Sequence, residues 1–150
     1  CIDQQNKVSF LPISFDRASF GNAFQVTDAR IDIGNDGKLA LIVTAMATAG
    51  QGPLYQRVYR ANADGSNLTL IAKLDSSRTS GMEDITVGPD DDIYVLTAQK
   101  SNEVIYRIDQ NNKVSKFIAI ATGRDPKSID MDCYGNLWFC TTVGIFRAQH

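Results

Sequence analysis

The feature that most constrains this chain is an outline that occurs three times along it. The copies are "RIDIGNDGKLALIVT" from Arg30, "DITVGPDDDIYVLTA" from Asp84 and "SIDMDCYGNLWFCTT" from Ser128. Each copy has a short segment with alternating apolar residues, then a turn rich in Gly, Pro, Asp or Asn, then a longer apolar run. Such turn residues tolerate the dihedral angles of tight turns, and period-two alternation is typical of strands. Each copy is therefore predicted to be a β-hairpin.

Two further strands follow the first two copies. The segments "YQRVYR" and "VIYRI" are predicted third strands, and "LTLIAKL" and "VSKFIAI" are predicted fourth strands. Helical periodicity does not persist anywhere, so the prediction is an all-β fold. Four antiparallel strands that recur every 44 to 54 residues are typical of the blades of a β-propeller.

The two ends of the chain complement each other. The N-terminal "IDQQNKVSFLPI" nearly copies "IDQNNKVSKFIAI" from Ile108, whereas the C-terminal "GIFRAQH" matches a third strand and lacks a fourth. One domain, residues 1–150, is thus predicted to hold three four-stranded blades. They cover residues 29–74, residues 83–120, and residues 127–150 together with 4–15, so that a strand at Val8–Leu11 completes the last blade. Complementary ends close a ring without leaving open sheet edges.

Three blades are too few for a closed ring, because known rings have about four to eight. Two alternatives follow. Either two chains form a six-bladed ring as a homodimer, or these residues belong to a longer propeller. The sequence leaves both open.

Composition excludes several classes of protein. A chain of 150 residues with 43% hydrophobic and 21% charged residues is typical of one globular domain. The net charge is −2 and no Lys/Arg cluster stands out, so we expect no nucleic-acid partner. The longest apolar runs, such as "LALIV" and "FIAIA", are far shorter than the roughly 20 residues of a membrane-spanning helix.

Histidine and cysteine are scarce. The one histidine, His150, argues against a Ser-His-Asp triad, and Cys1, Cys133 and Cys140 match no zinc-site spacing. Cys133 and Cys140 flank the third hairpin, where either a cross-strand disulfide or free thiols are expected. The triplet that begins at Asn67 is a candidate glycosylation site in a secreted protein.

Two stretches resemble known propeller repeats. The stretch "DPKSIDMDCYGNLWFCTTVGIFR" resembles the repeat of NHL-type and streptogramin-lyase-type propellers, and "MEDITVGPDDDIYVL" resembles that of secreted bacterial six-bladed propellers. This resemblance implies a six-bladed fold and a secreted, extracellular or periplasmic location. It does not imply one activity, since the fold hosts lyases, lactonases, lectin-like binders and scaffolds. Streptogramin-type lyases use a histidine at the central tunnel, whereas gluconolactonase-like propellers hold calcium there on Glu, Asn and Asp.

Candidate site residues lie where the innermost strands begin. In the repeat, Glu83 and Lys127 occupy equivalent positions just before such a strand. Arg30 and Asp84 occupy the next position. Asp130 lies two residues further along the strand than that position. These five are the candidate ligand-binding residues. Glu83 and Asp84 are also candidate ligands of a Ca²⁺ ion, which is the only cofactor the sequence indicates. The alternative is that the carboxylates hydrogen-bond to backbone amides.

The sequence favours a non-catalytic module that binds a small ligand, a glycan or a protein and is secreted or on a cell surface. The alternative is a calcium-dependent lactonase or hydrolase with a carboxylate site at the tunnel. Residues 12–28 and 47–56 enlarge two connections and break the symmetry of the repeat, which indicates a functional face.

Overall fold

The computed structural model describes residues 13–15, 20, 24–47, 55–74, 84–98, 103–121 and 126–148. These residues form three antiparallel sheets, with strand orders β1-β2-β3-β4, β5-β6-β7-β8 and β9-β10-β11. We call these sheets blade 1, blade 2 and blade 3. The strands are β1 Phe24–Ile33, β2 Leu39–Ala47, β3 Tyr55–Ala61, β4 Thr69–Lys73, β5 Asp84–Val87, β6 Ile93–Ala98, β7 Glu103–Ile108, β8 Val114–Ile120, β9 Pro126–Met131, β10 Leu137–Thr141 and β11 Gly144–Ala148.

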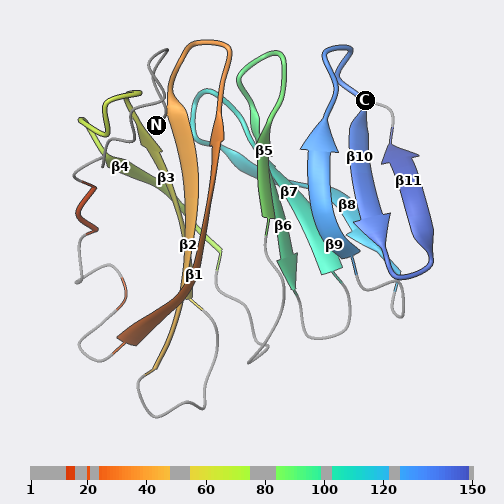
Figure 1. The fold of residues 1–150 in the computed structure, drawn as a ribbon, viewed down its shortest axis with the longest axis horizontal. Helices are drawn as coiled ribbons and strands as arrows, with labels where there is room; N and C mark the ends of the chain where they lie inside the picture. The colour runs from red at the N-terminus through yellow and green to blue at the C-terminus, as the bar shows by residue number, and fades with distance from the viewer. Residues whose placement is uncertain are drawn as a thin grey trace, which may run out of the picture.

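The three sheets stand side by side (Figure 1). The first strands β1, β5 and β9 contact one another in sequence, and the hairpin turns β1–β2, β5–β6 and β9–β10 lie along one edge, at the top of Figure 1. This is the arrangement of consecutive β-propeller blades, with β1, β5 and β9 innermost. The predicted all-β propeller fold is confirmed. The predicted strand at Val8–Leu11 lies outside the described residues.

One boundary differs from the prediction. β1 begins at Phe24, upstream of the expected start at Ala29, and it pairs with β2 as far as Ala47. A bulge between Val26 and Asp28 shifts the register and lets the pairing continue. The connection predicted at residues 12–28 is therefore shorter than expected.

Five hairpin turns share one geometry. In the first, Gly34 N donates to Lys38 O at 2.9 Å and Gly37 N donates to Gly34 O at 3.0 Å. The turns that begin at Asn62, Gly88, Asp109 and Asp132 repeat this pair of bonds. Each places its fourth residue at positive φ, where Gly, Asn and Asp are the least strained, and these residues are Gly37, Gly65, Asp91, Asn112 and Gly135.

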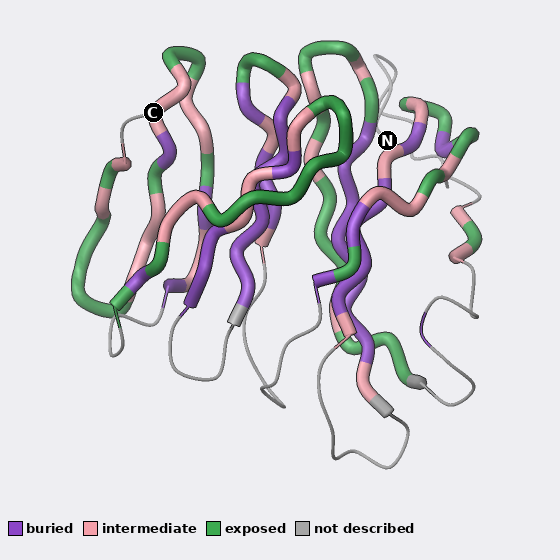
Figure 2. The backbone as a smooth tube through the Cα atoms, turned by 180° about the vertical axis from the view of Figure 1, so that it is seen from behind, coloured by how far each residue is buried: buried purple, intermediate pink, exposed green. Residues whose placement is uncertain are grey.

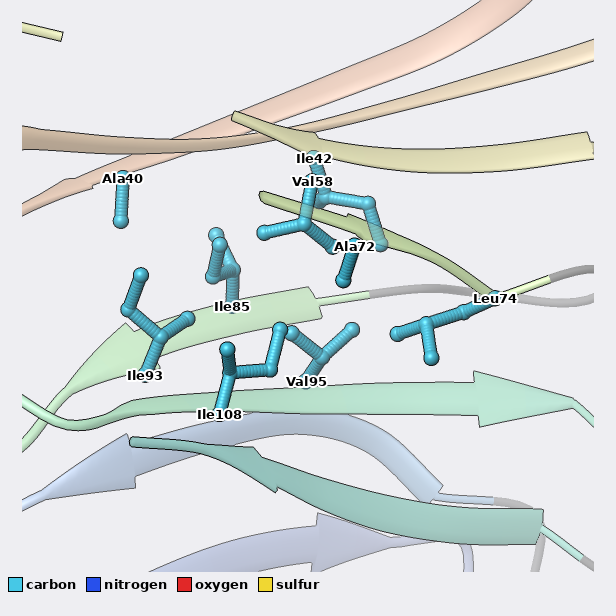
Figure 3. Packing of buried hydrophobic residues seen from close by; sticks show 9 residues of the cluster. All are labelled: Ala40, Ile42, Val58, Ala72, Leu74, Ile85, Ile93, Val95 and Ile108. Atoms are coloured by element: carbon cyan, nitrogen blue, oxygen red, sulfur yellow. The ribbon is translucent and has the colours of Figure 1, made fainter. Parts of the chain in front are cut away.

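Apolar side chains fill the spaces between blades. Since side chains alternate across a strand, the middle sheet has apolar residues on both faces. Its first face packs on blade 1, and Figure 3 shows the side chains of both sheets pointing toward each other. The members of this cluster are Ala40, Ile42, Val58, Ala72, Leu74, Ile85, Ile93, Val95 and Ile108. Its second face packs on blade 3 through Tyr94, Leu96, Ile105, Ile120, Ile129 and Leu137.

The two end blades are less enclosed than the middle blade. Figure 2 shows the β10–β11 edge mainly in the colours of exposed and half-buried residues, and β1 is likewise mostly exposed. A third cluster, which includes Leu41, Val43 and Tyr59, covers the face of blade 1 that points away from blade 2, and Ile13 and Phe15 pack against it. None of the described residues forms a helix that is long and apolar enough to cross a membrane.

Candidate functional site

The innermost strands are joined by aspartate side chains. Asp32 on β1 accepts a hydrogen bond from Val87 N of β5 through Oδ2 at 2.8 Å. Asp84 on β5 accepts one from Ile129 N of β9 through Oδ2 at 3.0 Å. An inner strand has an edge without a neighbouring strand, and an ionised carboxylate is a strong acceptor for such an edge N–H group. These two aspartates therefore tie each blade to the next.

Other inner-strand aspartates accept hydrogen bonds from their own strand. Asp28, Asp32 and Asp130 each use Oδ1 to accept the N–H of the following residue at 2.8 Å. Asp130 Oδ1 also lies 3.5 Å from the hydroxyl of Thr86 on blade 2, which donates to it. The oxygens of these carboxylates therefore accept hydrogen bonds from groups of the protein itself, both within a strand and between blades.

The structure brings some of the predicted site residues into contact with a neighbouring blade. Asp84 and Asp130 both lie where β5 meets β9. Arg30 instead pairs with Asp28, with 3.1 Å between Nε and Oδ2, and both side chains are exposed. Lys127 is half-buried near the start of β9. Glu83 lies outside the described residues, so the predicted pairing of Glu83 with Asp84 stays a prediction.

The residues described contain no group of three or more His, Cys, Asp and Glu side chains placed to hold a metal ion. Asp84 already binds a backbone amide through one oxygen. The predicted Ca²⁺ site at Glu83 and Asp84 therefore needs residues beyond those described.

Cys133 and Cys140 are both free thiols, Cys133 exposed and Cys140 half-buried. The register explains this, because β10 places Cys140 opposite Ser128 of β9, whereas Cys133 lies in the turn at the other end of β10. The cross-strand disulfide that the sequence left open is not formed.

A groove lined mostly by residues of polar type lies between blades 1 and 2, beside their hairpin turns. It has a volume of about 270 Å³ and spans the β3–β4 turn, the β7–β8 turn and the first hairpin. Four side-chain amides and two cations take part in its lining, together with a threonine hydroxyl. The lining residues are Lys38, Arg60, Ala61, Asn62, Asn67, Thr69, Ile71, Gln110 and Asn112.

Hydrogen bonds position the polar groups of this groove. Arg60 Nη2 donates to Asp91 O at 3.0 Å, and Gln110 Nε2 donates to Asp90 O at 2.6 Å. Lys38 Nζ is 2.8 Å from Asp36 Oδ2, so that its charge is largely balanced. Arg60 and Gln110 are therefore held in place, and the lining is rich in side-chain amides. Sequence reasoning missed it, although the repeat places the amide-rich turns "ANADGSN" and "DQNNK" at the same position of adjacent blades.

Asp132 organises the hairpin turn of blade 3. Its carboxylate accepts hydrogen bonds from Tyr134 N at 3.0 Å, from Asn136 N at 2.9 Å and from Trp138 Nε1 at 3.0 Å. The indole hydrogen bond, followed by those of Asn136, lowers the pKa of Asp132 to about 2. The turn sequence "DCYGN" thus orients the indole ring of Trp138.

This depressed pKa predicts acid sensitivity. The folded state favours the ionised carboxylate, so its contribution to stability is complete above the ordinary aspartate pKa of about 4 and is lost as the pH falls toward 2. Urea unfolding between pH 5 and pH 2, followed through the one tryptophan, should show this loss in the wild type. Asp132→Asn should unfold with a smaller pH dependence over that range. An equal pH dependence in both proteins would contradict the assignment.

Comparisons with known proteins gave matches among solved structures. No model of a protein family matches this chain, and no curated protein matches it. Solved structures of virginiamycin B lyase from Staphylococcus aureus do match. The selenomethionine-substituted enzyme is 17% identical with a TM-score of 0.42, and the match covers 99% of this chain and 61% of that chain. These solved structures are of the streptogramin-lyase type whose repeats the sequence resembles.

A second match is the catalytically inactive histidine-to-alanine variant of that lyase with quinupristin. It is 14% identical with a TM-score of 0.42, and the match covers 85% of this chain and 60% of that chain. The present chain thus spans about three fifths of the length of these solved structures.

Proposed function

We propose that this chain is a non-catalytic binding module in which the groove between blades 1 and 2 holds a small polar ligand of the carbohydrate class. The observation that carries this proposal is the amide-rich lining of that groove. A side-chain amide offers both a donor and an acceptor, which suits the hydroxyl groups of a sugar. A volume of about 270 Å³ is slightly smaller than ordinary ligand pockets of about 300–1,000 Å³, which favours a small ligand or the end of a glycan.

The rigidity of the groove supports the same function. Arg60 and Gln110 are held by backbone carbonyls of the β5–β6 turn, and the Thr69 hydroxyl donates to Asn67 O at 3.1 Å. Side chains that are already ordered lose less conformational entropy when a ligand binds. The proposal includes an extracellular, periplasmic or cell-surface location, which rests only on the resemblance of the repeats to secreted propellers.

A single variant tests the groove. Binding of a panel of neutral and acidic oligosaccharides should identify a ligand, and calorimetry should then measure its affinity. Gln110→Ala should weaken that affinity about five- to tenfold, because one hydrogen bond contributes about 1 kcal/mol. Asn111→Ala is the matched control, since Asn111 is exposed in the same turn and does not line the groove. Equal affinities of the two variants, or no binding by the wild type, would contradict the proposal.

The same proteins separate this function from a calcium-dependent lactonase or hydrolase at Glu83 and Asp84. Glycan binding should persist when a chelator is added, and lactones and esters should not be hydrolysed. Hydrolysis that stops with the chelator and returns with Ca²⁺ would favour the enzyme.

A further inference from the structure

The third strand of each blade carries an arginine at the same position of the repeat. These arginines are Arg60, Arg107 and Arg147, and each lies opposite the second residue of the second strand of its blade. In blade 2, Arg107 donates a hydrogen bond through Nε to the carboxylate of Asp92. In blade 3, Arg147 lies over the ring of Trp138, 5.7 Å from its centroid. Two of the three blades thus supply this arginine with a carboxylate or an aromatic ring.

Blade 1 supplies neither partner. Lys38 occupies the position of Asp92, because the carbonyl oxygen of each accepts the hydrogen bond that closes its hairpin turn. The residue opposite Arg60 is Ala40, which has no ring. Arg60 donates from Nη2 to the backbone carbonyl oxygen of Asp91 at 3.0 Å, and it forms no ion pair with a carboxylate of the described residues. No described carboxylate therefore balances the charge of this guanidinium by direct contact.

The charges around the groove between blades 1 and 2 are unequal. Arg60 and Lys38 line this groove, and none of its described lining residues is an aspartate or a glutamate. The carboxylates of Asp36 and Asp91 belong to residues that line a separate small cavity, which also contacts both cations. Asp36 pairs with Lys38 at 2.8 Å, and Asp91 Oδ1 accepts the N–H of Asp36 at 3.1 Å. The groove therefore has an excess of positive charge at Arg60.

We propose that the carbohydrate held in this groove carries an acidic group, a carboxylate or a sulfate, and that Arg60 is the residue that selects for it. This inference rests on the proposed function of the groove. A guanidinium has five N–H groups, and the Asp91 carbonyl uses one of them, so a pair of parallel donors remains for two oxygens of one acidic group. The amides in the rest of the lining suit the hydroxyl groups of the same sugar.

Partial burial makes this charge effective in selection. Arg60 is half-buried, so water and salt screen its charge less than that of a fully exposed cation. A hydrogen bond between two ionised groups is also roughly twice as strong as one between neutral groups. A neutral sugar of the same shape gives Arg60 a weaker partner, and the groove therefore discriminates between sugars by their charge.

Pairs of sugars that differ only in an acidic group test the selection. Uronic acid oligosaccharides are compared with their methyl esters, and sulfated oligosaccharides with their unsulfated counterparts, so that the two sets distinguish a carboxylate from a sulfate. Calorimetry should give the wild type a Kd at least about tenfold lower for the acidic member of the pair that binds. Equal affinities within every pair would overturn this inference and leave the proposed function standing. Binding of no sugar at all would overturn both.

Three variants locate the selection at Arg60. Arg60→Gln keeps a donor for the Asp91 carbonyl but removes the charge, and Lys38→Asp restores the carboxylate that blade 2 places beside its arginine. In both variants, the acidic sugar should bind less than about threefold more tightly than its neutral counterpart. Arg147→Gln is the matched control, since Arg147 has the same position in the repeat but lies outside the groove, and it should keep the wild-type preference. Circular dichroism verifies that each variant folds. Retention of the preference in Arg60→Gln, or its loss in Arg147→Gln, would overturn the assignment to Arg60.

Discussion

Ile85→Ala is expected to lower the free energy of unfolding by about 2–5 kcal/mol, a large part of a typical total of about 5–15 kcal/mol. Ile85 lies on the innermost strand β5 and is 5% exposed in the cluster between blades 1 and 2 (Figure 3). Removing three carbons there leaves a cavity among side chains from two sheets, which cannot collapse without moving a blade. Urea unfolding in dilute solution, where association does not contribute, measures the change.

Ile31→Ala provides the matched control for this result. Ile31 has the same position in the repeat and the same chemistry, but it is 54% exposed. An exposed substitution of this kind usually changes stability by less than about 0.5 kcal/mol. Equal losses in the two variants would show that strand propensity, rather than burial between blades, determines the stability of the inner strands.

Arg107→Met is expected to cost about 3 kcal/mol, because it removes the cation that faces an almost fully buried carboxylate. Asp92 is 3% exposed, and its Oδ2 accepts a hydrogen bond from Arg107 Nε. That bond raises the pKa of Arg107. Asp90 is a second and weaker partner of Arg107, 3.8 Å from Nη2, and because it is half exposed it loses little when the arginine is replaced.

Two comparisons isolate the buried carboxylate as the cause. Asp92→Asn combined with Arg107→Met should recover more than half of the lost stability in thermal unfolding, since no charge is then left without a partner. Arg147→Met changes the arginine at the same position of blade 3, which lies exposed over the Trp138 ring at 5.7 Å, and it should cost less than about 1 kcal/mol. A double variant no more stable than Arg107→Met alone would contradict this explanation.

The repeat and the turn residues predicted the sheets, because a hairpin turn and the pairing of the two strands beside it depend on residues that are close together in the sequence. A turn such as "GNDGK" supplies Gly37 at the one position that requires positive φ, and the runs on either side pair as soon as that turn forms. The start of β1 was predicted too late, since the bulge at Val26 and Asp28 depends on the partner strand and has no local signal in the sequence.

The candidate site was less predictable because it depends on how adjacent blades are placed. Asp84 was chosen from the repeat as a ligand-binding residue, but which amide its carboxylate reaches depends on the offset between β5 and β9. The same holds for Gln110 and Arg60, which line one groove although they come from different blades. Such contacts follow from the spacing of sheets, which one sequence does not specify.

The position of blade 2 between two neighbouring blades determines where local opening of the protein begins. Blade 2 shares one apolar cluster with each neighbouring blade, whereas each end blade of the described chain shares a cluster with one other blade. Detaching an end blade therefore exposes a single interface, and detaching blade 2 exposes two. In repeat architectures this nearest-neighbour coupling makes local opening begin at the ends. Amides of β6 and β7 should then exchange with solvent only through the rarest openings, while those of β1 and β11 exchange through frequent ones.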